Sequence, residues 1–175
     1  MKSFKQHILE KLKVSVRNTI KHTLFPETKD ELKQMIEDEI SKNGNKCSLN
    51  HINVSKITDM SELFFGSKFN GDISNWDVSN VTDMGSMFYN SKFNGDISDW
   101  DVSSVENMEE MFSYSNFTGD ISNWDVSKVE NMYSMFFYSK FDGDISNWDV
   151  SQVRKMKYMF NYSPLENNPP KWYKE

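Results

Sequence analysis

Two series of aspartates recur at a fixed spacing and could carry metal chemistry. The first series is Asp72, Asp96, Asp120 and Asp144, and the second is Asp77, Asp101, Asp125 and Asp149. Successive members lie 24 residues apart, so stacked repeat units would place the carboxylates of each series about 5 Å from one another. Calcium takes carboxylate and carbonyl oxygens as ligands, which makes a calcium ladder one interpretation of the pattern.

The same aspartates also fit a structural role. Asp and Ser side chains hydrogen-bond nearby backbone amides in turns and caps, and a serine follows each of these aspartates two residues later. The glycine-dense nonapeptide of calcium-binding β-rolls is missing. We therefore favour structural Asp/Ser ladders, expect no metal and no cofactor, and leave calcium as the open alternative.

The remaining candidates for catalysis are few. The three histidines, His7, His22 and His51, lie outside the full repeats, and no nucleophile motif or phosphate loop is present. The carboxylates recur in every unit, whereas an active site needs one unique arrangement of residues. A glycan-cleaving carboxylate pair is the enzymatic alternative, but we expect a protein that is not an enzyme.

The elements that position these residues belong to a tandem repeat. The tryptophans Trp76, Trp100, Trp124, Trp148 and Trp172 follow one another at 24-residue steps, as do Phe69, Phe93, Phe117 and Phe141. A degenerate first unit begins near Leu49, so residues 49–172 form one array. A fixed period in this range is typical of a solenoid, in which each unit packs only on its neighbours.

Comparison of the copies predicts what each unit contains. Phe69, Gly71 and Ile73 alternate as in a short strand. Met84, Met87 and Phe88 are spaced i, i+3, i+4 and predict a short helix with one apolar face. The sequence thus predicts an α/β solenoid of about five 24-residue coils, each with a short strand, a turn and a short helix.

Two further segments precede the array. Residues 1–25 carry six Lys/Arg against one Glu, and apolar residues recur every four positions, which predicts a basic amphipathic helix that serves as a tether or arm. Those residues are Phe4, Ile8, Leu12, Val16, Ile20 and Leu24. Residues 26–48 form the predicted α-helical N-terminal cap, with a capping-box start at Thr28 and a helix over about 28–42. Prolines at the end of residues 49–172 predict a C-terminal cap.

Positions that differ between copies are candidates for binding. They lie opposite the predicted Met/Phe face, and eight of twenty are aromatic, although solvated faces usually carry Lys, Glu and Gln. The eight are Phe65, Tyr89, Tyr114, Tyr133, Phe137, Tyr138, Tyr158 and Tyr162. Exposed tyrosine is typical of contact surfaces for proteins or sugars. Stacking of these rings between coils is the alternative.

With the segments WDVSNVTDMGSMF and FNGDIS, the repeats closely resemble the WDVSxVTDMxxMF repeat of BspA-type leucine-rich-repeat surface proteins of bacteria and phages. The resemblance covers about residues 50–163. It implies a leucine-rich-repeat-like solenoid and a role in adhesion or protein–protein contact rather than catalysis. Larger members are secreted or lipid-anchored, whereas the N-terminal residues here lack a signal-peptide pattern.

We therefore expect a non-enzymatic binding module for a protein or glycan ligand, of adhesion or receptor type, with a virion or host surface protein as one such partner. The alternative is a structural or decoration component of a phage particle, in which the solenoid is a rigid spacer. The net charge of −6 argues against nucleic acid, and no stretch predicts a transmembrane segment. A virion or cytoplasmic location is expected before secretion, with the cell surface left open.

Overall fold

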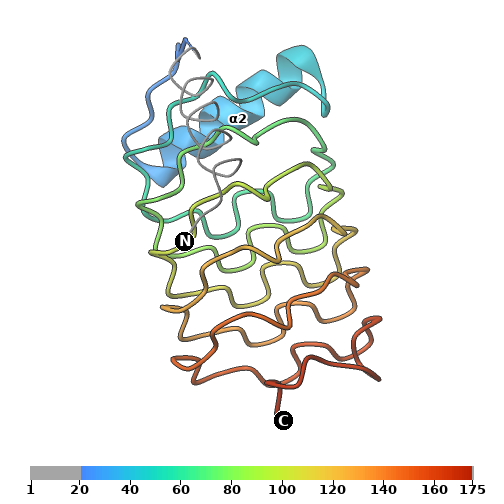
Figure 1. Cartoon of the computed structure of the whole chain (residues 1–175). Helices are drawn as coiled ribbons and strands as arrows, with labels where there is room; N and C mark the ends of the chain where they lie inside the picture. Colours follow the sequence, from blue (N-terminus) through green and yellow to red (C-terminus); the bar gives the residue numbers. More distant parts are fainter. Residues whose placement is uncertain (1–20, 175) are drawn as a thin grey trace, which may run out of the picture.

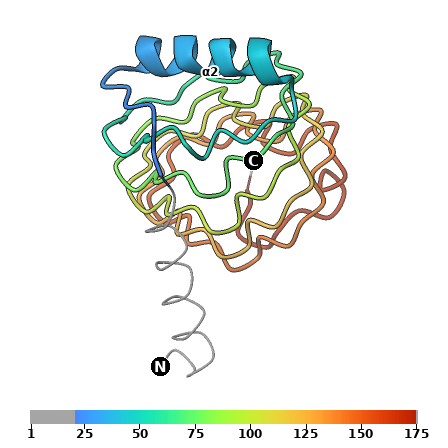
Figure 2. The ribbon, with the colours of Figure 1, turned by 90° about the horizontal axis from the view of Figure 1, so that it is seen from above.

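The computed structural model describes residues 21–174, so the predicted tether residues Phe4, Ile8, Leu12, Val16 and Ile20 lie outside the described part of the chain. Within it the 24-residue units stack as successive coils along one direction (Figure 1). Isolated parallel bridges join equivalent positions of neighbouring coils: Asp59 to Asp83, Asp83 to Asn107, Asn107 to Asn131, and Asn131 to Lys155. Seen along the stack, the coils overlie one another around a common interior (Figure 2).

The segment expected to be a short helix in each coil is instead a series of turns. In the second coil the amides of Met84, Ser86, Phe88 and Asn90 donate to carbonyls of the next coil, at Asn107, Glu109, Met111 and Ser113. The alternate amides of Met87, Tyr89 and Ser91 close turns within the coil. Because every second amide points to the neighbouring coil, no helical hydrogen-bond series can form, and the predicted short helix is wrong.

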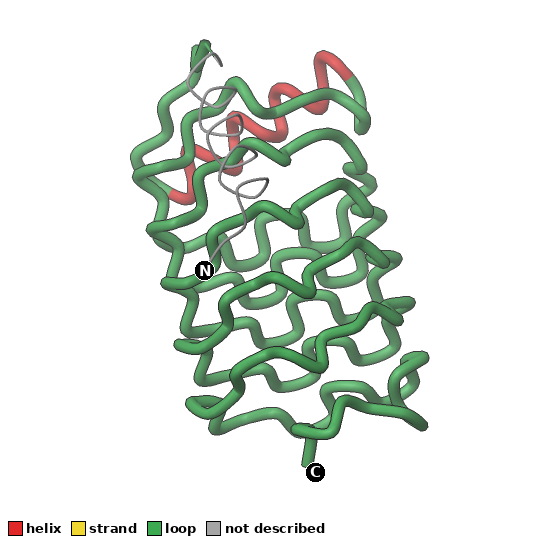
Figure 3. Tube along the Cα trace, in the orientation of Figure 1, coloured by secondary structure: helices red, strands yellow, loops and turns green. Residues whose placement is uncertain are grey.

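The predicted strand is also shorter than expected. Around Gly71 the backbone pairs with the preceding segment, since the amide of Asp72 donates to the carbonyl of Cys47 and Ser48 forms a bridge with Asp72. In the next copy the amide of Asn94 donates to the side chain of Asn70 instead of to its backbone. Apart from helix α2, the described residues are therefore turns and isolated bridges (Figure 3).

The interior is a ladder of aromatic and apolar side chains, as the repeat pattern predicts. Successive rings of Phe64, Phe88, Phe112, Phe136 and Phe160 stack with centroids 5.5, 5.6, 5.8 and 5.9 Å apart. Met84, Met87 and Phe88 are fully buried. Their apolar surface therefore points into the coil even though the backbone that carries them is not helical.

Tryptophan ties each coil to the one before it. The indole Nε1 of Trp124 donates to the carbonyl of Ile97 at 3.1 Å, and that of Trp148 donates to Ile121 at 3.2 Å. The same bond recurs at Trp76, Trp100 and Trp172. Each bond adds a second donor, from the next coil, to a carbonyl that already accepts an amide of its own turn, as the Ile97 carbonyl accepts the amide of Trp100. The tryptophan is therefore both a core residue and a clamp between coils.

Helix α2, Lys29–Asn43, lies at the N-terminal end of the stack (Figure 1). Thr28 accepts a hydrogen bond from the amide of Glu31, and Gly44 ends the helix with a φ of 81°. The capping box is incomplete, because Glu31 accepts from the amide of Glu27 rather than from that of Thr28. Leu32 and Ile36 are buried in the core cluster, so the helix shields apolar residues of the first coil.

Both ends of the stack are covered by non-repeating chain. At the N-terminal end Leu24 forms a parallel bridge with Ile52, and the amide of Thr23 donates to His51. Leu24 was expected on the stripe of an amphipathic helix, and this is wrong, because its backbone pairs with the edge of the first coil. At the other end Trp172 donates to the carbonyl of Ile145 and stacks on Trp148 at 6.4 Å, as expected of a residue that closes the last coil.

We expect Trp124→Phe to lower the free energy of unfolding by about 1–3 kcal/mol, because it removes the buried hydrogen bond to the Ile97 carbonyl and puts a smaller ring in the core, while the Trp100 amide still donates to that carbonyl. Urea unfolding followed by circular dichroism measures the difference. Trp172→Phe is the matched control and should lose less, because its hydrogen bond is only partly buried. An equal loss in the two variants would contradict the clamp interpretation.

Candidate functional site

The recurring aspartates hold the corners of the coils. Asp125 Oδ1 accepts from the amide of Ser127 at 3.1 Å and from its hydroxyl at 2.6 Å. The pair Asp72 and Ser74 makes the same two bonds. In the degenerate first unit Asn53 replaces the aspartate and binds Ser55 in the same way. A neutral amide therefore satisfies the turn, which shows that the corner needs an acceptor rather than a charge.

Those bonds change the acidity of the aspartates. The hydroxyl and the amide of Ser127 hold the pKa of Asp125 below its usual range, because both bonds favour the charged carboxylate. Ser151 lowers the pKa of Asp149 for the same reason. Among residues 21–174, no three His, Cys, Asp or Glu side chains come together in an arrangement that could hold a metal ion.

The eight aromatic residues singled out from the sequence gather on one face of the stack, which we call the aromatic face. Most are well exposed: the exposed fraction is 53% for Phe65, 44% for Tyr114, 48% for Tyr138 and 59% for Tyr162. Tyr158 is also exposed, whereas Tyr89, Tyr133 and Phe137 are half-buried. The turn segments present them outward, whereas the pair of apolar residues that precedes them, such as Met87 and Phe88 before Tyr89, points into the core.

Most of these rings contact one another from coil to coil. Phe65 stacks on Tyr89 with a centroid distance of 4.7 Å, and Tyr89 meets Tyr114 at 5.6 Å. Tyr114 stacks on Tyr138 at 5.1 Å, and Tyr138 stacks on Tyr162 at 4.3 Å. Phe137 packs edge-on against this strip, and Tyr133 packs against Tyr158 beside it. Ring stacking, the alternative to binding, is thus present together with exposure.

Four of the tyrosines, Tyr158 among them, occupy a backbone conformation that tyrosine disfavours, and the other three hold equivalent positions in successive coils. Tyr114, Tyr138 and Tyr162 have φ of 55°, 52° and 58°. In the first two coils the equivalent positions hold Gly66 and Asn90, also at positive φ, and these residue types adopt the left-handed region most readily. A residue with a Cβ costs about 1–2 kcal/mol there. Something other than local backbone preference therefore favours tyrosine in the last three coils.

A shallow groove of about 470 Å³ opens between the rings. It is lined by Tyr89, Glu110, Tyr114, Tyr133, Ser134, Phe137, Tyr158, Asn161 and Tyr162. Burial, together with the nearby carboxylate of Glu110, raises the pKa of Tyr89, so its hydroxyl stays protonated and can donate. Sequence reasoning had not singled out Glu110, Ser134 and Asn161 within the groove. Their signal was present, since all three occupy positions that vary between copies.

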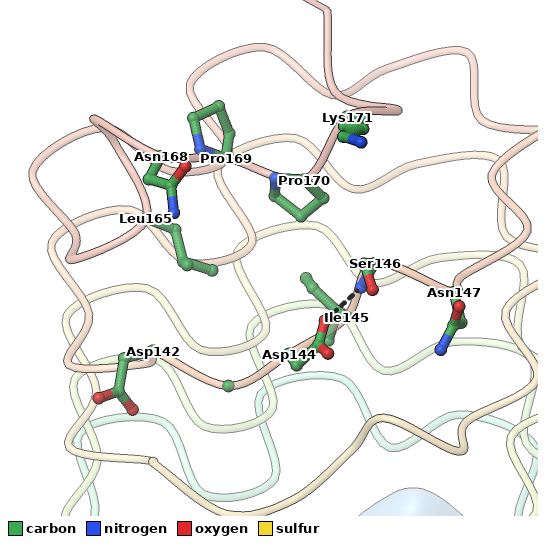
Figure 4. Close-up of a pocket in the computed structure, with 11 residues that line it drawn as sticks. Asp142, Asp144, Ile145, Ser146, Asn147, Leu165, Asn168, Pro169, Pro170 and Lys171 are labelled. Atoms are coloured by element: carbon green, nitrogen blue, oxygen red, sulfur yellow. Dashed lines mark hydrogen bonds between the residues drawn. The ribbon is translucent and has the colours of Figure 1, made fainter.

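A second hollow, of about 670 Å³, lies at the C-terminal end of the stack (Figure 4). Its walls are residues 142–147 of the last full repeat and the closing segment with Leu165, Pro169 and Pro170. The acidic residues of its lining are Asp142 and Asp144, and Asp144 accepts a hydrogen bond from the amide of Ser146 at 2.9 Å. The hollow marks the point where the proline-rich segment departs from the repeat.

The stack and its face define a class, that of tandem-repeat proteins whose buried positions are constant and whose exposed aromatic positions vary. More narrowly, the sequence matches the family described as "Mycoplasma protein of unknown function, DUF285" over residues 30–137 and 113–174, and the chain belongs to this family. The match agrees in general terms with the resemblance to bacterial repeat proteins. No curated protein and no solved structure matches the sequence. Within residues 21–174, no helix is long and apolar enough to cross a membrane.

The corner aspartates predict a loss of stability in acid. Because the folded pKa of Asp125 lies below the unfolded value of about 3.9, its contribution is present above pH 4 and is lost as the pH falls through the folded pKa. We expect Asp125→Asn to keep the turn, as Asn53 does, and to flatten the dependence of stability on pH between about 5 and 2. Asp125→Ala should destabilise at neutral pH as well. Urea titrations at several pH values measure both, and identical pH profiles for wild type and Asp125→Asn would contradict the assignment.

The positive φ of Tyr138 predicts that the fold tolerates asparagine at this position. Tyr138→Asn should change the free energy of unfolding by less than about 1 kcal/mol, because the relief of the positive φ offsets the lost ring stacking. Tyr138→Ala should destabilise more, since alanine gains no such relief. Urea unfolding compares the two variants. A large loss in Tyr138→Asn would mean that the ring serves the fold itself.

Proposed function

We propose that this chain is a non-catalytic module for protein–protein contact, and that the aromatic face is its contact surface. The observation that carries the proposal is the column occupied by Gly66, Asn90, Tyr114, Tyr138 and Tyr162. The chain itself contains residues that suit this conformation, yet three coils hold tyrosine at an unfavourable φ. Strain of this kind is tolerated where a side chain is needed for function.

Exposure supports the same proposal. Tyr138 and Tyr162 remain about half exposed although they stack on each other. Tyrosine buries a large area on binding at low entropic cost and carries a hydroxyl that can donate or accept. Tyr and Trp are also enriched among the residues that contribute most to binding energy at protein interfaces.

The ring geometry favours a protein over a sugar as the ligand. A sugar ring usually packs on the open face of an aromatic ring, but Tyr114 and Tyr138 stack with an interplanar angle of 4°, and Tyr138 and Tyr162 stack with one of 23°. The face of the middle ring, Tyr138, is covered on both sides. At Tyr138 the ring edge and the hydroxyl remain for a ligand, and these suit the mixed apolar and polar surface of another protein.

The wider expectations from the resemblance belong to the same proposal. A leucine-rich-repeat-like solenoid would give the face its rigidity, since the buried Phe and Trp ladders fix each coil on the next. Adhesion to a surface protein is the form of contact that the BspA-type resemblance implies. Both ideas rest on the aromatic face being used for binding.

The proposal is tested with a variant designed from the chain itself. In the double variant Tyr114→Asn with Tyr138→Asn, both positions take the residue found at Asn90. Immobilised wild type and variant are compared for the proteins that they capture from the source cells, quantified by mass spectrometry. We expect at least a 10-fold loss of the captured partner, equal to about 1.4 kcal/mol of binding energy.

The control is a double variant away from the aromatic face, Asp125→Asn with Lys128→Ala, which should capture as wild type does. Circular dichroism and the unfolding midpoint of each variant confirm that the fold is kept. Equal capture by wild type and the tyrosine variant would remove the aromatic face from the function.

A further inference from the structure

The aromatic face lies between two rows of charge of opposite sign. The chain crosses this face once in every coil, from positions 58–59 to position 68 in the first coil and at the equivalent positions in later coils. The row where the crossing begins, the acidic rim, is Asp59, Asp83, Glu106 and Glu130. The row where it ends, the lysine rim, is Lys68, Lys92 and Lys140.

The fifth coil reverses this arrangement. At the equivalents of Glu130 and Asn131 it carries Arg154 and Lys155, so the first rim becomes basic there. On the other rim Pro164 replaces the lysine, and the exposed Glu166 follows two residues later. The signs therefore change on both sides of the face in the same coil, and on the first rim Arg154 also pairs with Glu130 of the preceding coil at 3.1 Å.

We propose that the aromatic face binds a second copy of this chain, face to face, around a two-fold axis parallel to the stack. The inference rests on the proposed function of this face and names its partner. Such an axis places the acidic rim of one copy opposite the lysine rim of the other in the first, second and fourth coils, while the third coil holds Asn116 in place of a lysine. Asp83 of one copy then meets Lys92 of its partner, and the symmetry repeats the contact on the other side.

The opposite orientation is disfavoured by the same charges. A two-fold axis perpendicular to the stack would bring the lysine rim against the lysine rim and the acidic rim against the acidic rim. Like charges placed against each other at an interface cost several kcal/mol and thereby suppress wrong pairings. The pattern of the rims thus selects one of the two symmetric arrangements.

The repeat period fixes how the two copies align. Stacked rings on the face lie 5.1 and 4.3 Å apart, and a second copy presents its ring edges at the same spacing. All coils can therefore meet their counterparts at once, which a partner with a different spacing could not do. A slip by one coil would set Arg154 and Lys155 against Lys140, so the reversed fifth coil selects the in-register pairing.

Charge exchange between the rims provides the test. The variants are Lys92→Glu and Asp83→Lys. The fifth coil holds Lys155 at the equivalent of position 83, but in the second coil Asp83 also accepts hydrogen bonds from the Gly85 amide and from Asn107, so the folded state of this variant has to be verified. Sedimentation equilibrium of the full chain should show a dimer for wild type. Each variant alone sets two like-charge contacts at the interface and should raise the dimer Kd at least 10-fold.

Mixing the two variants should restore a dimer that contains one chain of each kind, because the glutamate introduced in one chain then faces the lysine introduced in the other. A tag on one variant identifies this mixed dimer by mass. The controls Lys128→Glu and Asp125→Lys make the same charge changes away from the face and should leave the Kd unchanged. Circular dichroism verifies that all four variants are folded.

A wild type that stays monomeric at about 100 µM would overturn the inference, and so would a dimer whose Kd neither variant changes or a mixture that does not restore it. These outcomes are separate from failure of the proposed function. If the wild type is a monomer and its capture of another protein falls in the double variant Tyr114→Asn with Tyr138→Asn, the proposed function stands and the inference of a dimer is overturned. If the dimer Kd is unchanged in the double variant Tyr114→Asn with Tyr138→Asn, the aromatic face is not the dimer interface, and both the inference and its premise are overturned.

Discussion

The structure depends on hydrogen bonds between equivalent positions of successive coils. Each coil gives the next one four amide donors, for example those of Met84, Ser86, Phe88 and Asn90. These bonds can form only if neighbouring units have the same length and backbone path, since a single inserted residue would misplace every donor that follows. The constant positions of the repeat are those that keep this match, while the Trp clamps and stacked Phe rings fill the space that it encloses.

How much could be predicted from the sequence follows from this constraint. The period, the buried set and the outward aromatic residues are visible, because they depend on side-chain type and spacing alone. The backbone conformation is not visible in the same way. Met84, Met87 and Phe88 have helical spacing, but consecutive turns place the same side chains inward, and the deciding positive φ values fall on ordinary residues such as Ser86 and Glu110. Glycine or asparagine marks the turn only at Gly66 and Asn90.

For the candidate site the sequence shows which residues are exposed but not what their positions cost. Only the backbone shows that Tyr138 has a disfavoured conformation. Only the neighbouring coils show that both faces of its ring are covered. The first fact supports our proposal that the aromatic face binds a ligand, and the second is the reason that we propose a protein rather than a sugar as this ligand. The charged residues of the two rims, in contrast, can be identified in the sequence once the path of the chain across the aromatic face is known.

The amides of the turn segments that bond to the next coil all donate in the same direction, and this gives the stack a net dipole along its axis. In a regular parallel sheet neighbouring peptide dipoles nearly cancel. Here four series of equivalent peptide groups all point their N–H toward the C-terminal end, and one of these series is Glu62, Ser86, Glu110 and Ser134. Three series at the rims, through Thr82, Asp83 and Lys92, point the other way and cancel only part of the effect. The array thus resembles a helix macrodipole, with its negative end beside the Lys29 ammonium that contacts Asp59. Its two caps could not be exchanged, because one must supply donors and the other acceptors.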